Sequence, residues 1–396
     1  MPWKITLLIA AAIAISYFDR QTLPVAIAAI QKDIPISNSE FSQLQAAFLV
    51  AYAIMYAGGG KLIDVMGTRK GFAAVMVGWS LACAGHGLAN GFGFLAASRF
   101  LLGMGEGGGF PAATKAVAEW FSVRDRAAAM GVINAGTAVG AVLAPPLIAF
   151  VIAGMGWRWV FVFAGATGLV WAICWVWMVG DPPEREVEAD RESGEWFRLL
   201  VRKEIWSLVV AKFLSDAAWY FYLFWLPKYL YDMRGFDTKK VGYYAWIPYA
   251  ASGMGSLAGG WYSSWLLRQG HSVNRARKLA LGMSASVMPI ILLVDSAPVE
   301  MAIAIFSVAF FGQQAWSTLV MILPTDLVPG RTVGSVAGMV GFGGAMGGVV
   351  FGLIVGYLLD HGYGYPPVFA MAASFHVLAF LLILLAIPKI ERLEIQ

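Results

Sequence analysis

The sequence predicts an all-α integral membrane protein with twelve transmembrane helices in two six-helix halves. The chain has 396 residues, of which 59% are apolar and 13% are charged, and its mean hydropathy is +0.69. Soluble domains carry about 25% charged residues, so this composition is typical of a membrane protein instead. The apolar residues also gather in segments close to the ~20 residues that a helix needs to cross a bilayer.

The first half is expected to contain spans at about residues 4–30, 40–61, 71–90, 94–121, 127–153 and 158–180. The second half is expected to contain spans at about residues 204–231, 238–267, 279–295, 298–324, 331–358 and 365–388. The charged stretch 181–203 separates them and is predicted to be a solvated cytoplasmic linker, with a regulatory segment as the alternative. We therefore expect six-helix bundles over residues 1–180 and 204–396. A cleaved signal peptide is disfavoured, because the first apolar run resumes after Arg20.

Charged side chains inside two of these spans are the strongest functional signal. Asp19 and Arg20 interrupt the first span, and Arg99 and Glu106 lie in the fourth. A charge at the centre of a spanning helix costs about 2.5–3.5 kcal/mol on insertion scales. Arg99 and Glu106 are nearly two turns apart and therefore share one helix face. The four charges predict a polar pathway for a charged solute.

Lysine and arginine residues fall mainly in loops on one side of the predicted spans. These loops contain Arg69, Lys70, Arg124, Arg126 and the basic residues of the linker. Because positively charged loops stay in the cytoplasm, both termini are expected to be cytoplasmic. The expected location is a bacterial-type inner membrane, which the chain crosses several times.

The loop after the second span has a fixed pattern of Gly60, Asp64, Gly67 and a basic pair. A similar glycine and basic cluster follows the eighth span. A two-fold repeat of six spans is typical of transporters that rock about a site at the midplane. We expect a gating latch in which Asp64 pairs with Arg124 or Arg126, next to Arg69. The alternative for the basic residues is that they only follow the positive-inside rule.

This loop resembles the signature of the major facilitator superfamily. Within that superfamily, the motifs Tyr17-Phe-Asp19-Arg20 and Arg99 to Pro111 resemble those of the anion:cation symporter family. Segments 211–216, 219–229 and 325–329 resemble hexuronate transporters in particular. The resemblance covers nearly the whole chain and implies the major facilitator fold. Galactonate-type members carry an asparagine in the eleventh span, where this chain has only small and apolar residues over 340–348, which argues against galactonate itself.

Glu106 is the first candidate for proton coupling and Asp19 is the second. A buried carboxylate takes up a proton when its cationic partner leaves and releases it when the partner returns. Arg99 would be the internal counter-charge. Resemblance to galactonate and sialic-acid transporters implies the same two carboxylates as proton carriers. The alternative is that these charges form static salt bridges that hold the bundle together, as Asp19–Arg99 and Arg20–Glu106 in some pairing.

Arg20 is the preferred ligand of a substrate carboxylate, because its planar fork donates two parallel hydrogen bonds and stays charged when buried. Arg99 remains the alternative for this role. The resemblance places Tyr17 and Tyr52 at the substrate as well. Each supplies a hydroxyl that donates and accepts hydrogen bonds, whereas interfacial belt tyrosines would lie near span ends.

Further candidates for substrate binding are Asn134 and Thr137 in the fifth span and Gln314 and Trp316 in the tenth. Asn134 and Thr137 are equally compatible with helix–helix hydrogen bonds. A tryptophan face stacks on a sugar ring, and an amide binds hydroxyls.

Two spaced pairs and one further carboxylate have structural interpretations. Lys212 and Asp216 are spaced for an intrahelical pair, although Lys212 at an interface would snorkel instead. Asp326 is expected to cap or latch the tenth span. Lys115 and Glu119 are expected to form an ordinary surface pair.

The remaining motifs exclude several function classes. Neither the two cysteines nor the four histidines show metal-ligand spacing, so no metal site and no cofactor are expected. Gly103, Gly105 and Gly108 match a dinucleotide fingerprint but lack the strand that must precede it, so they are assigned to helix packing or bending. No nucleophile–base set is evident, so no enzyme is expected. The scattered basic residues do not predict nucleic-acid binding.

The sequence therefore predicts a proton-coupled symporter that imports a small organic anion, foremost a hexuronate such as glucuronate or galacturonate. The transporter would work by alternating access, and protons would be the coupling ion. We expect a monomer whose partners are this anion and membrane lipid. The alternatives are a proton-driven exporter of drugs or metabolites and a sugar-acid receptor that does not transport.

Overall fold

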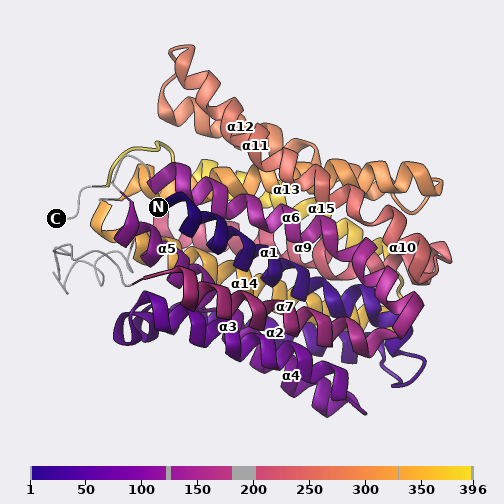
Figure 1. Ribbon diagram of the computed structural model, residues 1–396. Helices are drawn as coiled ribbons and strands as arrows, with labels where there is room; N and C mark the ends of the chain where they lie inside the picture. The colour runs from indigo at the N-terminus through magenta and orange to yellow at the C-terminus, as the bar shows by residue number, and fades with distance from the viewer. Residues whose placement is uncertain (1, 122–125, 181–201, 329, 394–396) are drawn as a thin grey trace. The chain divides into compact units, whose positions relative to one another are not determined.

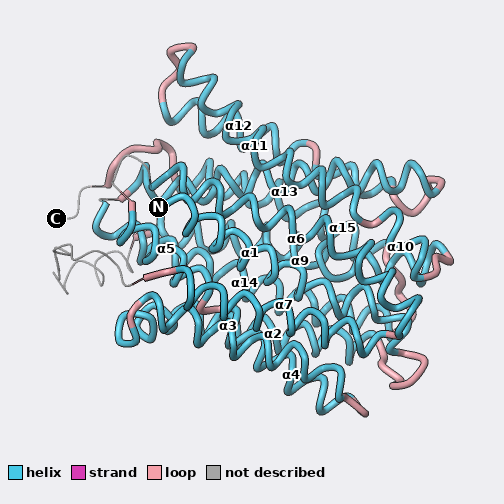
Figure 2. The backbone as a smooth tube through the Cα atoms, in the orientation of Figure 1, coloured by secondary structure: helices cyan, strands magenta, loops and turns pink. Residues whose placement is uncertain are grey.

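The computed structural model describes residues 2–121, 126–180, 202–328 and 330–393, and these residues form helices without any β-strand (Figure 2). The chain divides into two compact units. Unit 1 comprises residues 1–186 and 223–246, and unit 2 comprises residues 187–222 and 247–396. The expected bundles 1–180 and 204–396 differ from these units chiefly at 223–246.

Unit 1 contains the first six expected spans (Figure 1). It also contains the second part of the long helix that begins the C-terminal half of the chain. Its elements are α1 (Pro2–Ile30), α2 (Asn38–Met66), α3 (Thr68–Gly85), η1 (His86–Leu88), α4 (Phe92–Glu106), α5 (Gly109–Trp120), α6 (Arg126–Met155), α7 (Trp157–Met178), the end of α9 (Lys203–Arg234) and α10 (Thr238–Tyr244).

Unit 2 contains the beginning of α9 and the remaining helices. Its other elements are α11 (Trp246–Arg268), α12 (Val273–Ser286), η2 (Met288–Leu293), α13 (Val299–Leu327), α14 (Gly330–Asp360) and α15 (Pro366–Ala386). Seven segments of the described chain are long and apolar enough to cross a membrane: Thr68–Leu88, Ala129–Met155, Trp157–Met178, Val273–Leu293, Val299–Leu327, Val336–Asp360 and Pro366–Ala386. The count of twelve stays a prediction.

Local signals explain several helix ends. Ser37 and Glu40 form a capping box at the start of α2, which satisfies backbone N–H groups that the first turn leaves unpaired. Asp237 caps α10 in a similar way. Gly67 separates α2 from α3 with φ +75°, a left-handed conformation that glycine adopts without steric cost.

Glycines let helices approach closely in unit 1, where α1 packs against α6 (Figure 1). A Cβ atom on Gly136 would overlap the carbonyl oxygen of Ala10, and one on Gly140 would overlap that of Ala14. The two glycines are four residues apart, so they lie on one face of α6. Small residues at this spacing are typical of closely packed membrane helices.

Unit 2 repeats this contact between α9 and α14. A Cβ atom on Gly343 would lie 2.8 Å from the carbonyl oxygen of Val209, and one on Gly347 would overlap that of Phe213. The spacing of four residues is the same on both helices. This contact makes α9 the counterpart of α1, with Phe213 in the place of Ala14.

A second pair of contacts repeats in the same way. In unit 1, Gly103 of α4 and Gly107, which directly follows α4, lie against the backbone of Phe48 and Tyr52 in α2. In unit 2 the glycines lie on the other helix: Gly255 and Gly259 of α11 lie against Phe311 and Ala315 of α13. The two-fold repeat inferred from the loops is therefore present in the helix contacts.

The expected span 94–121 is interrupted in the structure. α4 ends at Glu106, Gly107 and Gly108 form a turn, and α5 begins at Gly109. A Cβ atom on Gly107 would lie 2.7 Å from the carbonyl oxygen of Tyr52, so close packing and the bend occur at the same glycine. The carboxylate of Glu106 consequently stands at a helix end.

Candidate functional site

Glu106 and Arg20 form a buried ion pair between α4 and α1. The Nε atom of Arg20 donates to Oε2 of Glu106 at 2.8 Å, and the two side chains are 3% and 0% exposed. The Ser16 hydroxyl donates to the same Oε2 at 2.6 Å. Ser16 is four residues before Arg20, so both point from one face of α1 toward the glutamate. Oε1 of Glu106 is buried and accepts no hydrogen bond from the described residues.

Aromatic rings surround the guanidinium group of Arg20. Its Cζ atom lies 4.6 Å from the ring centroids of both Tyr17 and Tyr52 and 5.4 Å from that of Phe48. Such rings attract a cation through their electron-rich faces. The two predicted substrate tyrosines are thus brought together with the predicted substrate arginine.

Arg99 has a different partner. Its Nη2 atom donates to the side-chain oxygen of Gln45 at 2.9 Å, while Nε and Nη1 are buried and have no hydrogen-bond partner among the described residues. The residue is 0% exposed. In this structure Glu106 therefore pairs with Arg20, and the role of Arg99 as counter-charge to Glu106 stays a prediction.

Asp19 is also fully buried in unit 1. Neither of its carboxylate oxygens accepts a hydrogen bond from a described nitrogen or oxygen donor. The thiol of Cys83 in α3 is its polar neighbour. A buried carboxylate in such surroundings is costly as an anion, which suits a group that carries a proton.

Asn134 and Thr137 of α6 are not joined to this cluster by any described hydrogen bond. Asn134 is exposed, and the Thr137 hydroxyl donates to the Asn134 carbonyl at 2.7 Å. Their contribution to substrate binding stays a prediction.

The predicted gating latch lies largely outside the described residues. Arg124 is not described, and the side chains of Asp64 and Arg126 are not described either. Arg69 donates from Nη2 to the carbonyl of Val176 at 2.6 Å, near the end of α7. A cation at a helix C-terminus interacts favourably with its unpaired carbonyls, so Arg69 caps α7 in this structure.

In unit 2, the two predicted substrate-binding residues of α13 differ in their burial. Trp316 is fully buried and its ring packs edge-on against His376, while Gln314 is half-buried. Gln314 is one residue before Ala315, as Glu106 is one residue before Gly107. The repeated contacts therefore place Gln314 in unit 2 where Glu106 stands in unit 1.

Lys212 and Asp216 form the intrahelical pair that their spacing allows. The Nζ atom of Lys212 lies 2.9 Å from Oδ1 of Asp216 and also donates to the Ser317 hydroxyl at 2.9 Å. Lys212 is buried, so it does not snorkel here. Elsewhere in unit 2, Arg277 pairs with Asp326 at 2.8 Å and donates to Ser263 at 2.7 Å, which links α12, α13 and α11.

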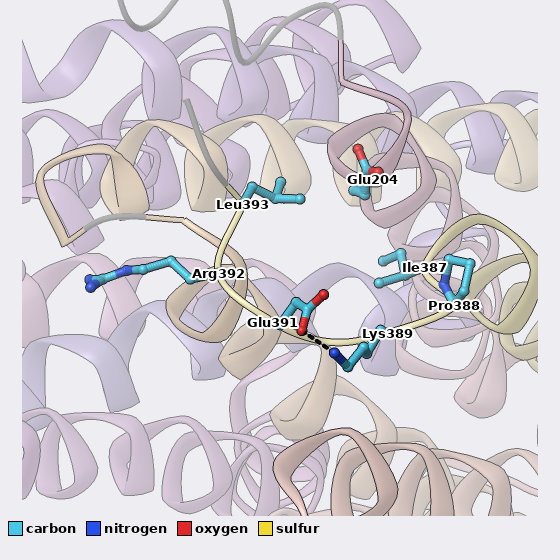
Figure 3. A pocket seen from close by; sticks show the side chains of 7 residues that line it. All are labelled: Glu204, Ile387, Pro388, Lys389, Glu391, Arg392 and Leu393. Atoms are coloured by element: carbon cyan, nitrogen blue, oxygen red, sulfur yellow. Dashed lines mark ion pairs between the residues drawn. The ribbon is translucent and has the colours of Figure 1, made fainter. Parts of the chain in front are cut away.

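One open cavity of about 550 Å³ lies at the end of unit 2 beside the C-terminal segment. Its lining consists of Glu204, Ile387, Pro388, Lys389, Glu391, Arg392 and Leu393 (Figure 3). The Lys389–Glu391 ion pair in this segment is well exposed. None of the buried charged residues lines this cavity, so it is distinct from the candidate site.

Sequence reasoning missed Ser16 and Gln45, which hold Glu106 and Arg99. It also missed the hydrogen bond between the Gln313 side chain and His376, both fully buried in unit 2. A signal was present for Ser16, since it lies one turn before Arg20. Gln45 and Gln313 are amides in apolar helices, a weaker sign that many membrane helices share.

Comparisons with known proteins agree with this architecture. The sequence model of the Major Facilitator Superfamily matches residues 9–352. A solved structure of a bacterial homologue of the human lysosomal transporter Spinster, in an inward-facing and unoccupied conformation, superimposes with a TM-score of 0.77. That structure is 16% identical and covers 97% of this chain and 95% of its own, so the likeness concerns the fold.

Curated relatives are similar over most of their length. The hexuronate transporter of Escherichia coli K12 is 28% identical over 99% of this chain and 95% of the relative. The galacturonate transporter of Dickeya chrysanthemi is 32% identical over 72% of this chain and 88% of the relative. The D-galactonate transporter of Escherichia coli O6:H1 is 28% identical over 96% and 94%. The predicted all-α membrane fold and the hexuronate-transporter-like character of the chain are confirmed.

Proposed function

Because the chain belongs to the major facilitator superfamily, we propose that it is a proton-coupled symporter that imports a hexuronate or a similar sugar acid. The family and fold are those of a membrane transporter. Similarity to a hexuronate and a galacturonate transporter supports a sugar acid as the substrate. Direction and coupling are inferred from the charges of unit 1.

The observation that carries the proposal is the ion pair in which Arg20 is bound to Glu106. Glu106 holds one side of its guanidinium group at 2.8 Å in a buried environment. A substrate carboxylate that binds this arginine bidentately through Nε would need the nitrogen that Glu106 occupies. Glu106 and the substrate would therefore compete for Arg20, and protonation of Glu106 would decide the competition.

This competition yields a transport cycle by alternating access. On the outside, a proton neutralises Glu106, and Arg20 becomes available to the anion. Tyr17 and Tyr52 flank the guanidinium group and offer hydroxyls to the bound sugar acid. On the cytoplasmic side the proton leaves, Glu106 reclaims Arg20, and the anion is released. The binding free energy of the anion is thereby tied to the proton.

Asp19 provides the second proton site in this scheme. Asp19 directly precedes Arg20 in the sequence, and its carboxylate is buried. Among the described residues, no nitrogen or oxygen donates a hydrogen bond to this carboxylate. A protonated Asp19 avoids an unpaired buried charge. Arg99 stays bound to Gln45 and supplies positive charge to the cluster. Two protons for one monoanion would make import electrogenic.

The wider setting follows the same proposal. The transporter would reside as a monomer in a bacterial-type inner membrane, with both termini in the cytoplasm. Its partners would be the anion and lipid, and protons would serve in place of any cofactor.

The test is uptake of labelled glucuronate into proteoliposomes with an imposed inward pH gradient. Wild-type protein is expected to concentrate the anion, whereas Glu106→Gln is expected to exchange it only between equal concentrations. Glu119→Gln is the matched control, because Glu119 belongs to a partly exposed pair with Lys115 at 3.9 Å. This control should concentrate glucuronate as the wild type does.

Two results would overturn the proposal. Binding of glucuronate without flux would indicate a receptor. Movement of another class of solute in the direction opposite to the protons would indicate an exporter. Concentrative uptake by Glu106→Gln would remove Glu106 from the coupling mechanism.

A further inference from the structure

Gln45 of α2 is a buried amide of unit 1, and only one end of its side chain is hydrogen-bonded. The side-chain oxygen accepts from Nη2 of Arg99 at 2.9 Å, whereas the Nε2 atom is buried and has no hydrogen-bond partner among the described residues. The residue is 2% exposed. Burying an unpaired amide group costs free energy, so packing alone does not favour a glutamine here. The contact with Arg99 is the interaction that this side chain provides.

Arg99 lies among the other charges of unit 1. The ring centroid of Phe48 is 5.5 Å from Cζ of Arg99 and 5.4 Å from Cζ of Arg20, so one ring lies beside both guanidinium groups. Phe48 is three residues after Gln45, and both therefore lie on one face of α2. The titratable and charged groups that interact with Arg99 are Asp19, Arg20, Cys83, His86 and Glu106. The described hydrogen bond of Arg99 nevertheless goes to a neutral amide.

Arg99 and Asp19 both have unused hydrogen-bonding atoms. Nε and Nη1 of Arg99 and both carboxylate oxygens of Asp19 are buried and have no nitrogen or oxygen partner among the described residues. The other carboxylate, that of Glu106, is bound to Arg20 at 2.8 Å. An ionised Asp19 should attract the unused N–H groups of Arg99, because two buried ions are far more costly apart than paired. The described arrangement is therefore the one expected of a protonated Asp19.

A glutamine is suited to hold an arginine that changes its partner. Its amide oxygen accepts a hydrogen bond from the guanidinium group without carrying a charge, whereas an ionised carboxylate adds the attraction of a full charge. Arginine stays charged in a buried site, so Arg99 needs an acceptor in both protonation states of Asp19. Gln45 supplies one while Asp19 is protonated, and an ionised Asp19 can take Arg99 from the amide.

We propose that Gln45 is a positioning residue that holds Arg99 while Asp19 carries its proton and yields Arg99 to Asp19 when that proton leaves. Gln45 acts through Arg99 and contacts neither the anion nor the proton. The inference rests on the proposed function, since it assumes that Asp19 is a coupled proton site. It adds the residue that sets the pH range over which Asp19 is protonated.

The test is the pH dependence of glucuronate binding to the purified full chain. In the proposed cycle the anion binds to the protonated transporter, so the pH midpoint of binding reports the proton affinity of the two carboxylates. The midpoint is compared between the wild type, Gln45→Met and Gln45→Glu. Methionine has a similar length but offers only a weak acceptor, whereas glutamate has the same shape and binds Arg99 with a charge.

Gln45→Met is expected to shift the midpoint to lower pH by about one unit, the effect of losing one hydrogen bond to a charged group. Arg99 loses its amide acceptor and turns to Asp19, which favours the ionised state of that carboxyl. Gln45→Glu is expected to shift the midpoint to higher pH, because the new carboxylate keeps Arg99 away from Asp19. A merely structural glutamine would not give shifts of opposite sign.

Asp19→Asn identifies the group that responds. Asparagine does not ionise, so the pH dependence that remains in this variant is that of Glu106 in the proposed cycle. Adding Gln45→Met to Asp19→Asn should leave the remaining midpoint unchanged. A shift that persists in this background would place the effect on Glu106 and overturn the inference.

Gln31 offers a matched control in the same unit. Its side chain also makes a hydrogen bond, but Nε2 donates to the backbone carbonyl oxygen of Ile36 at 2.7 Å, and the residue follows the end of α1. Gln31→Met should leave the pH midpoint of binding unchanged. A shift as large as that of Gln45→Met would contradict the proposal.

Unchanged midpoints in both Gln45 variants, or shifts in the same direction, would overturn the inference. If Gln45→Met does not fold, Gln45→Glu decides the question by itself, because only a midpoint at higher pH supports the proposal and any other result refutes it. Absence of glucuronate binding by the wild type at every pH would instead count against the proposed function, so the two failures are distinguishable.

Discussion

Arg20 and Glu106, which are 86 residues apart in the sequence, meet at 2.8 Å and are almost completely buried. The contact joins the first helix of unit 1 to the helix end that Gly107 and Gly108 create. Ser16 adds a second donor to the same glutamate oxygen. Among the described residues, the cation in direct contact with Glu106 is therefore Arg20, the arginine that we propose as the ligand of the substrate carboxylate.

The first prediction concerns the choice between the two arginines. Arg20→Lys keeps the charge but loses the fork that binds a carboxylate with two hydrogen bonds. We expect glucuronate affinity to fall about tenfold or more, the effect of losing a hydrogen bond to a charged group. The measurement is equilibrium binding to purified protein at constant pH.

Arg99→Lys is the comparison for this experiment. Arg99 donates to an amide rather than to a carboxylate, so its replacement should reduce glucuronate affinity much less. A larger loss for Arg99→Lys than for Arg20→Lys would assign the substrate to Arg99.

The second prediction separates the ring of Tyr52 from its hydroxyl. Tyr52→Phe preserves the aromatic face that lies 4.6 Å from the Arg20 guanidinium carbon, whereas Tyr52→Ala removes it. If the hydroxyl binds the sugar acid, Tyr52→Phe should weaken glucuronate binding about fivefold to tenfold, the value of a typical hydrogen bond. Thermal stability should be unchanged in Tyr52→Phe and lower in Tyr52→Ala. Equal affinities of Tyr52→Phe and wild type would limit this residue to holding Arg20.

The sequence predicts the members of the charged cluster better than their pairing. Asp19, Arg20, Arg99 and Glu106 stand out because charges in apolar helices are rare and costly, and all four are buried in unit 1. Spacing along one helix placed Arg99 on the face of Glu106. The partner of Glu106 is nevertheless on another helix, because the crossing of α1 and α4 is a tertiary property that one-dimensional spacing does not contain.

The helix ends show the same limit. Residues 94–121 form one apolar segment by composition, yet α4 ends at Glu106 and α5 begins at Gly109. Gly107, between the two helices, packs on the α2 backbone. The glycines themselves were predictable as packing or bending residues. Their contact partners became visible only in the structure, and they revealed the counterpart helices of the repeat.

The third prediction uses glycine contacts to test the packing of α1 on α6. Gly140→Ala would place a methyl group on the Ala14 carbonyl oxygen, and overpacking of this kind costs about 1–3 kcal/mol. Gly154→Ala on the same helix meets nothing within 4 Å and is the matched control. Melting temperature in detergent should fall clearly for Gly140→Ala and stay unchanged for Gly154→Ala. Equal melting temperatures would mean that α1 and α6 are further apart than described.

The fourth prediction concerns pH dependence at the loop after α1. Hydrogen bonds from Trp157 and Arg158 hold the pKa of the Asp33 carboxyl below its usual range. A carboxyl whose pKa is lower in the folded state stabilises that state above its unfolded pKa, and this contribution disappears as pH falls through the folded value. The pair is about half exposed, so the effect should be small.

Asp33→Asn should therefore lower the melting temperature slightly at pH 7 and by a smaller amount at pH 3, relative to the wild type. The difference should also shrink in high salt, because exposed charges are screened. An identical difference at both pH values would show that the carboxylate charge is not what Trp157 and Arg158 recognise.

The last prediction distinguishes a structural carboxylate from a coupling one. Asp326 accepts a hydrogen bond from Arg277 at 2.8 Å, and Arg277 also donates to Ser263. The three residues lie on α13, α12 and α11, so the pair fastens the ends of three helices of unit 2. A double-mutant cycle with Arg277→Ala and Asp326→Ala should give a coupling energy of about 0.5–3 kcal/mol, as expected for residues in direct contact.

Transport provides the second measurement for this pair. Asp326→Asn retains an oxygen that accepts from Arg277 and should still concentrate glucuronate with an inward pH gradient, at a lower melting temperature. Glu106→Gln should behave oppositely, with exchange but no concentration. Loss of concentrative uptake with intact exchange in Asp326→Asn would move proton coupling into unit 2, since a helix-fastening carboxylate has no reason to separate the two activities.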